Sequence, residues 1–175
     1  MQFDPNAYGP EVAAILALDG NGERLMPLIQ GPCSSLQAKA ALDALAPRKL
    51  LRETALAGLY LYFSCWEEAH EISQNIATPE GSYWHAIVHR QEPDAGNAGY
   101  WFRQVGAHPI FPALREEAAQ IGVDFGSRWN PVAFIDRCER ARRAHASNAE
   151  RMALETQRAE WQLLFDYCAA KNRRA

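Results

Sequence analysis

The strongest constraint on the fold of this 175-residue chain is the near absence of strand patterns. Alternation of β-branched and polar residues with a period of two is almost missing, whereas Ala, Leu, Glu and Arg recur at helical spacing. A chain of this length forms one domain and can bury a core without the help of disulfides. The sequence therefore predicts a single compact all-α domain of about seven helices that spans residues 1–175.

Capping residues and prolines divide the chain into the expected helices. The run at residues 55–63 is apolar on every side, which is typical of a helix at the centre of a core. We expect it to belong to a helix that Pro47 opens. Ser64 and Glu67 form a capping-box pattern, S-x-x-E, for the helix that follows. The other expected helices are 11–18, 35–45, 82–90 with Ser82 as its cap, 94–105, 112–122, one beginning at Pro131, and 148–170.

The charge distribution indicates which classes of partner the protein can bind. The chain has a net charge of −3 and lacks the basic footprint of a nucleic-acid-binding protein. Segment 66–108 holds six acidic residues against two arginines, which favours a cation or a small polar molecule over a polyanion as ligand. The first residues do not resemble a signal peptide, and no apolar run reaches the length of a membrane span. We therefore expect a cytoplasmic protein that binds neither nucleic acid nor a membrane.

The cysteines offer no recognisable motif. Cys33, Cys65, Cys138 and Cys168 form no C-x-x-C pair and do not have the spacing of a zinc ribbon. We expect four free thiols in a reducing compartment. Cys65 is expected to be buried and inert, although a thiolate–imidazole pair with His70 is an alternative.

The residues best suited to chemistry gather in segment 66–108. Its 43 residues hold four of the five histidines and three of the five tryptophans. His85 and His89 are spaced i, i+4, so they lie on one helix face and can share one metal ion. The general base of a zinc peptidase would stand at position 86, which is Ala86 here, so that class is excluded. The nearby candidates for further ligands are His70, Glu92, Asp94 and His108. The alternative is that these histidines are simply hydrogen-bonded in a pocket or in the core.

Other side chains of this segment are candidates for catalysis or binding. Glu92 has no capping role to explain it and is a candidate general base or metal ligand. His70 lies among hydrogen-bond acceptors that can fix its tautomer, which suits proton transfer. Asp94 is expected to cap the next helix, a role that leaves ligand binding open. The remaining candidate ligand-binding residues are Gln74, Trp84, Arg90, Asn97, Tyr100, Trp101 and Arg103.

The core of the segment reads AHEISQ and then GSYWHAIVHRQEPDAGNAGYWFRQVGAHP. It resembles the core of a family of bacterial and fungal proteins to which no activity is assigned. The resemblance runs from about residue 55 to residue 114, and it implies no reaction or cofactor. The matching positions are His70, Gln74, Trp84, His85, His89, Arg90, Glu92, Asp94, Asn97, Tyr100, Trp101, Arg103, Gly106 and His108.

These patterns favour an enzyme that acts on a small polar molecule. His85 and His89, with His70 or His108, would hold zinc, iron or manganese, and Glu92 would act as base or ligand. The candidates for binding the substrate are Arg90, Asn97 and Arg103. The first alternative is a metal-free binding module or acid–base enzyme, with an organic ligand stacked between Trp84 and Trp101. The second is a structural or interaction protein.

Overall fold

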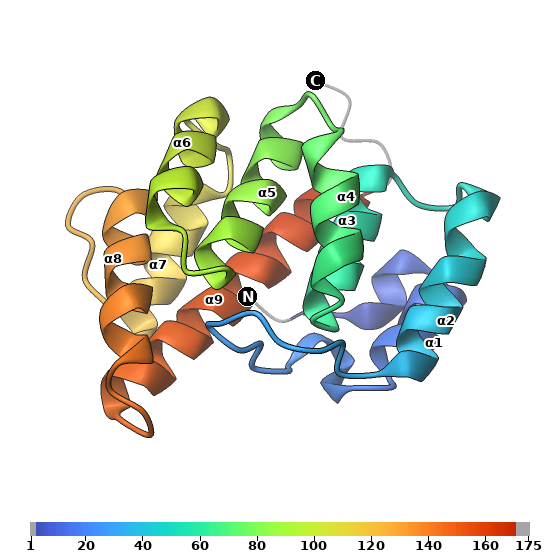
Figure 1. Cartoon of the computed structure of the whole chain (residues 1–175), viewed down its shortest axis with the longest axis horizontal. Coiled ribbons are helices and arrows are strands. Elements are labelled where there is room, and N and C mark those ends of the chain that lie inside the picture. The colour runs from blue at the N-terminus through green and yellow to red at the C-terminus, as the bar shows by residue number, and fades with distance from the viewer. Residues whose placement is uncertain (1–2, 171–175) are drawn as a thin grey trace.

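The structure is a computed structural model that describes residues 3–170 (Figure 1). Within this range the chain forms nine α-helices and three short 3-10 helices, and it contains no strand. The all-α class is confirmed, whereas the expected total of about seven helices was too low, although the segments in which a helix was expected also number nine. No helix within residues 3–170 combines the length and the apolarity needed to cross a bilayer. The α-helices are α1 (Pro10–Leu16), α2 (Leu36–Leu45), α3 (Glu53–Tyr62), α4 (Trp66–Gln74), α5 (Pro79–Gln91), α6 (Ala95–Val105), α7 (Phe111–Ile121), α8 (Pro131–Arg142) and α9 (Asn148–Ala169). The 3-10 helices are η1 (Pro5–Tyr8), η2 (Gly20–Gly22) and η3 (Ala46–Arg48).

The middle of the molecule is a row of neighbouring helices. Helix α4 packs against α3, α5 packs against α4, and α6 packs against α5, while the long helix α9 crosses behind the row (Figure 1). As predicted, α3 is a central helix, and every residue from Ala55 to Tyr62 is buried. Trp84 of α5 lies against Gly58 of α3, where a Cβ atom would come within 2.7 Å of the indole ring. Trp161 of α9 donates its Nε1–H to the Gly58 carbonyl oxygen at 2.7 Å.

Two helix starts near α3 differ from the prediction. Pro47 opens only the turn η3, because Lys49 adopts a left-handed conformation with φ of 50° and ends it. Helix α3 then begins separately at Glu53. Ser64 does not cap α4, since it has a φ of 57° and its hydroxyl accepts a hydrogen bond from Arg24 at 3.1 Å. Lys49 and Ser64 thus both turn the chain in a left-handed conformation, Lys49 within the helix expected from Pro47 and Ser64 at the position expected to cap α4.

Helix α5 begins earlier than predicted. Its N-cap is Thr78, whose Oγ1 accepts a hydrogen bond from the Gly81 N–H at 3.3 Å, and Ser82 lies inside the helix. Pro79 occupies the first turn, where its missing N–H costs nothing. Residues 78–81, TPEG, therefore form the start of the helix, four positions before the cap expected at Ser82. The cap predicted at Asp94 is confirmed, and the helix expected over 112–122 ends at the C-cap Gly122.

One pair of cysteines is bonded. Cys33 and Cys65 form a disulfide across 32 positions of sequence, so the expectation of four free thiols was wrong for this pair. Cys138 and Cys168 are free and buried. Burial raises the pKa of the Cys138 thiol to about 11 and that of Cys168 to about 12, so both remain protonated. The pairing escaped prediction because only the fold brings the segment before α2 onto the start of α4.

Candidate metal centre

Three histidines converge where α4 meets α5. His70 lies on α4, and His85 and His89 lie four residues apart on one face of α5. Since α5 is packed between α4 and α6, every residue from Gly81 to Gln91 is buried. The exposed fraction is 4% for His85 and 6% for His89, whereas His70 is half-buried. The packing of α4, α5 and α6 thus directs the histidine side chains into a region between these helices.

The ring nitrogens of these residues lie at ligand spacing. His85 Nε2 is 3.1 Å from His70 Nε2 and 2.9 Å from His89 Nε2. One nitrogen from each ring lies within 4.8 Å of the other two, as the ligand atoms of one ion would. We call His70, His85 and His89 the three-histidine group. His70, one of the candidates for a further ligand, therefore lies beside the His85–His89 pair.

Two side chains adjoin His89. Glu92 Oε2 lies 2.8 Å from His89 Nδ1, so the ring donates Nδ1–H and keeps its Nε2 lone pair toward the group. The side-chain amide of Asn97, on α6, lies 3.1 Å from His89 Nε2. Asp94 caps α6 by accepting the Asn97 backbone N–H at 2.9 Å, as predicted. A second group of potential metal ligands consists of His89, Glu92 and Asp94, and both of its carboxylates are exposed.

Aromatic rings hold the other two imidazoles. The Trp66 ring stacks on His70 with centroids 5.0 Å apart and an interplanar angle of 7°. Trp101 of α6 lies over His85 with centroids 4.2 Å apart. Trp66 is itself fixed, because its Nε1–H donates to the carbonyl oxygen of Val88 on α5 at 3.2 Å. Each ring of the three-histidine group therefore has a neighbour that restricts its rotation.

Burial favours the neutral form of two of these imidazoles, His85 and His70. Burial, together with repulsion from the charged forms of His89 and His70, lowers the pKa of His85 to about 4. Burial and the charge of His89 also lower the pKa of His70, against the opposing effect of Glu92. Neutral imidazoles have the free lone pair that metal binding requires.

Three predicted site residues lie elsewhere. His108 packs against Tyr83, Phe111 and Tyr167, and its Nε2 lies 3.8 Å from a carboxylate oxygen of Glu80. Trp84 is fully buried against α3, so no ligand can stack on it.

Arg90 is the third, and it belongs to the core. It is 1% exposed, forms an ion pair with Glu160 of α9 at 2.5 Å, and lies over the Phe134 ring at 4.5 Å. Its guanidinium is therefore directed away from solvent and occupied by protein groups.

The remaining predicted residues lie at the surface. Gln74 is exposed at the end of α4. Tyr100 is 47% exposed and meets the Trp101 ring edge-on at 5.3 Å, and Arg103 lies 5.9 Å from the Tyr100 ring. Tyr100, Trp101 and Arg103 thus extend outward from the three-histidine group along α6.

Trp66 was missed as a site residue. The signal was present, because Trp66 precedes His70 by four positions and the two therefore share a helix face. Glu160 and Gln157, which both bond Arg90, gave no such signal, since they are about 70 positions away along the chain.

Comparisons with known proteins give no independent assignment. No family model matches the chain, and neither a curated protein nor a solved structure is significantly similar to it. The chemistry of the site therefore has to be argued from its own geometry.

Proposed function

We propose that the three-histidine group binds a divalent transition metal and that the protein is a metal-dependent enzyme acting on a small polar molecule. The spacing of the three Nε2 atoms carries this proposal. Metal–nitrogen bonds of about 2.05 Å place tetrahedral ligands about 3.3 Å apart and octahedral neighbours about 2.9 Å apart. The separations of 3.1 and 2.9 Å from His85 Nε2 to the other two rings fall in this range, and His70 and His89 also have ring nitrogens within 4.8 Å of each other.

Hydrogen bonding alone leaves the group unsatisfied. His85 Nε2 faces two other Nε2 atoms, and a neutral ring nitrogen carries either one proton or one lone pair. If it carries a proton, it can donate to only one neighbour. If it carries a lone pair, the proton is on His85 Nδ1, which is buried and has no hydrogen-bond partner within the described chain. A metal ion would accept the Nε2 lone pairs of all three rings, so that no proton has to be shared among the Nε2 atoms; the His85 proton would then lie on Nδ1.

The ligand set favours zinc, with iron and manganese as the other candidates. Three histidines with a water in the fourth position is a common catalytic zinc site, and the bound ion would acidify that water to near neutral pH. The hydrogen bond from His89 to Glu92 would orient the ligand and increase its basicity. Asn97, next to His89 Nε2, would bind the water or a polar group of the substrate.

The surroundings suit a small polar substrate. Trp101 and Tyr100 would line its path, and Arg103 would contact any acidic group that it carries. Arg90, by contrast, is held in the core and contributes no substrate contact. The reaction class that fits is attack of a metal-bound water on an electrophilic carbon or phosphorus of the substrate.

The test is metal analysis of the purified protein, with zinc titration of the metal-free form. We expect one zinc per chain, lost in the His85→Ala/His89→Ala variant. The matched control is His145→Ala, because the His145 side chain is 84% exposed and has no contact with the group. Since the buried double variant can fail to fold, the half-buried His70→Ala tests the same site at lower structural cost.

Two outcomes decide the matter. Loss of zinc in His70→Ala with retention in His145→Ala supports the site. The proposal is abandoned if wild-type protein, folded and titrated with zinc, iron and manganese, binds none of them above trace. Glu92→Gln adds a finer measurement, because loss of an outer-shell partner weakens metal affinity about 10–100-fold.

A metal-free acid–base site is the second candidate. The observation in its favour is the 2.8 Å contact of Glu92 with His89, which is the arrangement that orients an imidazole for proton transfer. This candidate requires that a metabolite mixture raise the melting temperature in the presence of a strong chelator. A thermal shift that appears only with added metal would exclude it.

A further inference from the structure

Segment 26–35 links the two helices that carry the histidines. Its Gln30 N–H donates to the carbonyl oxygen of Gln91, the last residue of α5, at 2.7 Å. Its Ser34 N–H donates to the carbonyl oxygen of Phe63, just before α4, also at 2.7 Å. The segment therefore joins the end of α5, beside Glu92, to the start of α4.

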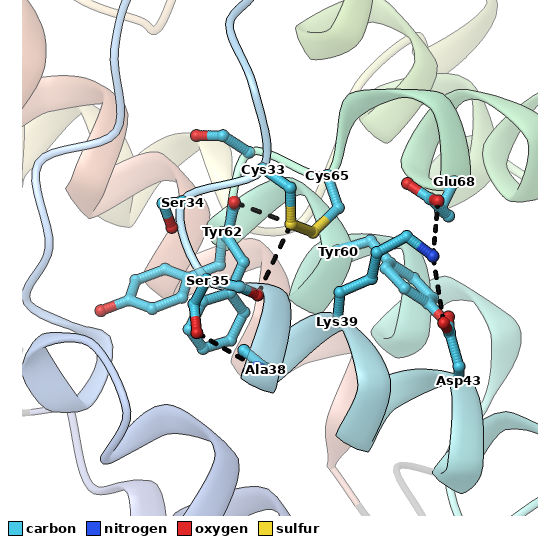
Figure 2. The surroundings of a disulfide bond; sticks show 12 residues. Cys33, Ser34, Ser35, Ala38, Lys39, Asp43, Tyr60, Tyr62, Cys65 and Glu68 are labelled. Atoms are coloured by element: carbon cyan, nitrogen blue, oxygen red, sulfur yellow. Dashed lines mark hydrogen bonds and ion pairs between the residues drawn. A yellow bond between two sulfur atoms is a disulfide. The ribbon is translucent and has the colours of Figure 1, made fainter.

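The Cys33–Cys65 disulfide is the only covalent part of this link within the described residues. Figure 2 shows it between the loop before α2 and the start of α4, beside Lys39, which bonds Glu68 of α4 at 2.8 Å. Reduction of the bond would leave the segment attached to α4 by non-covalent contacts alone.

The disulfide is one residue away from Trp66, which contacts the three-histidine group. Cys65 is the N-cap of α4, and Trp66 follows it directly. Trp66 stacks on His70 and donates its Nε1–H to Val88, the residue before His89. A displacement of the start of α4 would therefore move His70 and weaken the restraint on His89.

A thiol can reach one of the two sulfurs. Cys33 is half-buried, whereas Cys65 is 1% exposed. A hollow of about 270 Å³ lies beside the bond, and its lining includes Pro32, Leu36 and Trp66. Attack on Cys33 Sγ would make Cys65 the leaving group, at the N-terminal end of α4, where a thiolate is stabilised.

We propose that the Cys33–Cys65 bond is a thiol-exchange site for a dithiol, and that its reduction weakens metal binding by the three-histidine group. This inference rests on the proposed function. A thiolate of the dithiol attacks Cys33 Sγ, and Cys65 leaves as a thiolate that takes up a proton. The second thiolate of the dithiol then attacks its own sulfur in the mixed disulfide and releases Cys33, which is also protonated. The dithiol loses two electrons and becomes a disulfide, while the two cysteines gain them.

The experiment compares the zinc affinity of oxidised and reduced wild-type protein. Reduction uses dithiothreitol, which is removed without air before titration against a competing chelator, and alkylation mass analysis counts the free thiols. We expect the dissociation constant for zinc to rise about 10–100-fold on reduction, the range for loss of outer-shell support. With or without dithiothreitol treatment, the Cys33→Ser/Cys65→Ser variant should bind zinc as weakly as the reduced wild-type protein does. The variant also has no thiols at this site that could bind zinc themselves.

The control is Cys138→Ala, which keeps the disulfide and should retain the full difference between the two states. If the serine variant does not fold, the reduced wild-type protein decides alone, with far-ultraviolet circular dichroism to verify its helices. Equal zinc affinity in the two states overturns this inference and leaves the proposed function intact. Absence of zinc binding in the oxidised protein overturns the proposed function and this inference with it.

Discussion

The buried ion pair between α5 and α9 allows a quantitative test of how the core is held. Arg90 is 1% exposed, and the Glu160 side chain is fully buried. Glu160 accepts hydrogen bonds from Arg90 Nη2 at 2.5 Å, from Arg90 Nη1 at 3.3 Å and from the Tyr83 hydroxyl at 3.1 Å. Arg90 also donates to Gln157 Oε1 at 3.3 Å. The perturbation that we choose is Glu160→Gln, because it removes the negative charge and keeps the shape of the side chain.

The expected loss follows from the burial of the pair. Removing one partner leaves the Arg90 guanidinium charged in the core without a counter-charge, and such changes cost about 3–5 kcal/mol. The cation–π contact with Phe134, at 4.5 Å, contributes about 2 kcal/mol in this desolvated setting and does not replace the carboxylate. We therefore expect the free energy of unfolding to fall by about 3–5 kcal/mol.

Urea denaturation, followed by circular dichroism on the metal-free protein, measures this loss. With an m-value of about 2 kcal/mol per molar urea, the midpoint should fall by about 1.5–2.5 M. The control is Glu11→Gln, whose partner Arg48 is 54% exposed, and a surface pair of this kind is worth about 0–1 kcal/mol. A Glu160→Gln midpoint within about 0.5 M of wild type, at unchanged m-value, would refute the reasoning.

Three further results are expected. Burial lowers the pKa of His85 from 6.5 to about 4, so between these pH values the unfolded chain binds a proton at His85 that the folded chain does not. The free energy of unfolding of the metal-free protein should therefore fall as the pH decreases from 6.5 to 4. A His85→Gln variant should show a shallower fall when urea denaturation is repeated across this pH range. Gly58→Ala should lower the stability by about 1–3 kcal/mol, because the new methyl group meets the buried Trp84 ring at 2.7 Å; a melting temperature equal to that of wild type would contradict this packing. Asp94→Ala should cost about 1 kcal/mol by removing the cap of α6, while Asp94→Asn should retain most of the stability in the same denaturation assay.

The features that the sequence predicted correctly depend on neighbouring residues. Asp94 caps α6 and Gly122 ends α7 because each acts on backbone groups within a few positions of itself. The same applies to His85 and His89, whose shared face follows from helical spacing alone. The capping-box pattern at Ser64 gave a wrong prediction, because the Ser64 hydroxyl accepts a hydrogen bond from Arg24, which is distant in the sequence, and does not cap α4.

The features that the sequence did not predict depend on contacts between distant segments. Cys33 meets Cys65 only because segment 26–35 folds onto α4, and spacing carries no sign of this. Arg90 was expected to grip a substrate, since a charged residue beside two histidines is typical of a pocket. Its partner Glu160 lies 70 positions later, so its role in the core required the packing of α9.

Residues of the motif HAIVHR therefore lie on different sides of α5, with the three-histidine group on one side and the buried Arg90–Glu160 ion pair on another. Successive residues of an α-helix are rotated by about 100°, so Arg90 points away from its neighbour His89. His89 faces α4 and α6, where the three-histidine group lies, and Arg90 faces α9. Loss of activity in an Arg90 variant would therefore follow from unfolding as readily as from chemistry. Only variants whose stability is measured alongside zinc binding can assign a residue of this helix or its cap to the proposed metal site, and Glu92→Gln, at the C-cap and on an exposed side chain, is the cleanest of them.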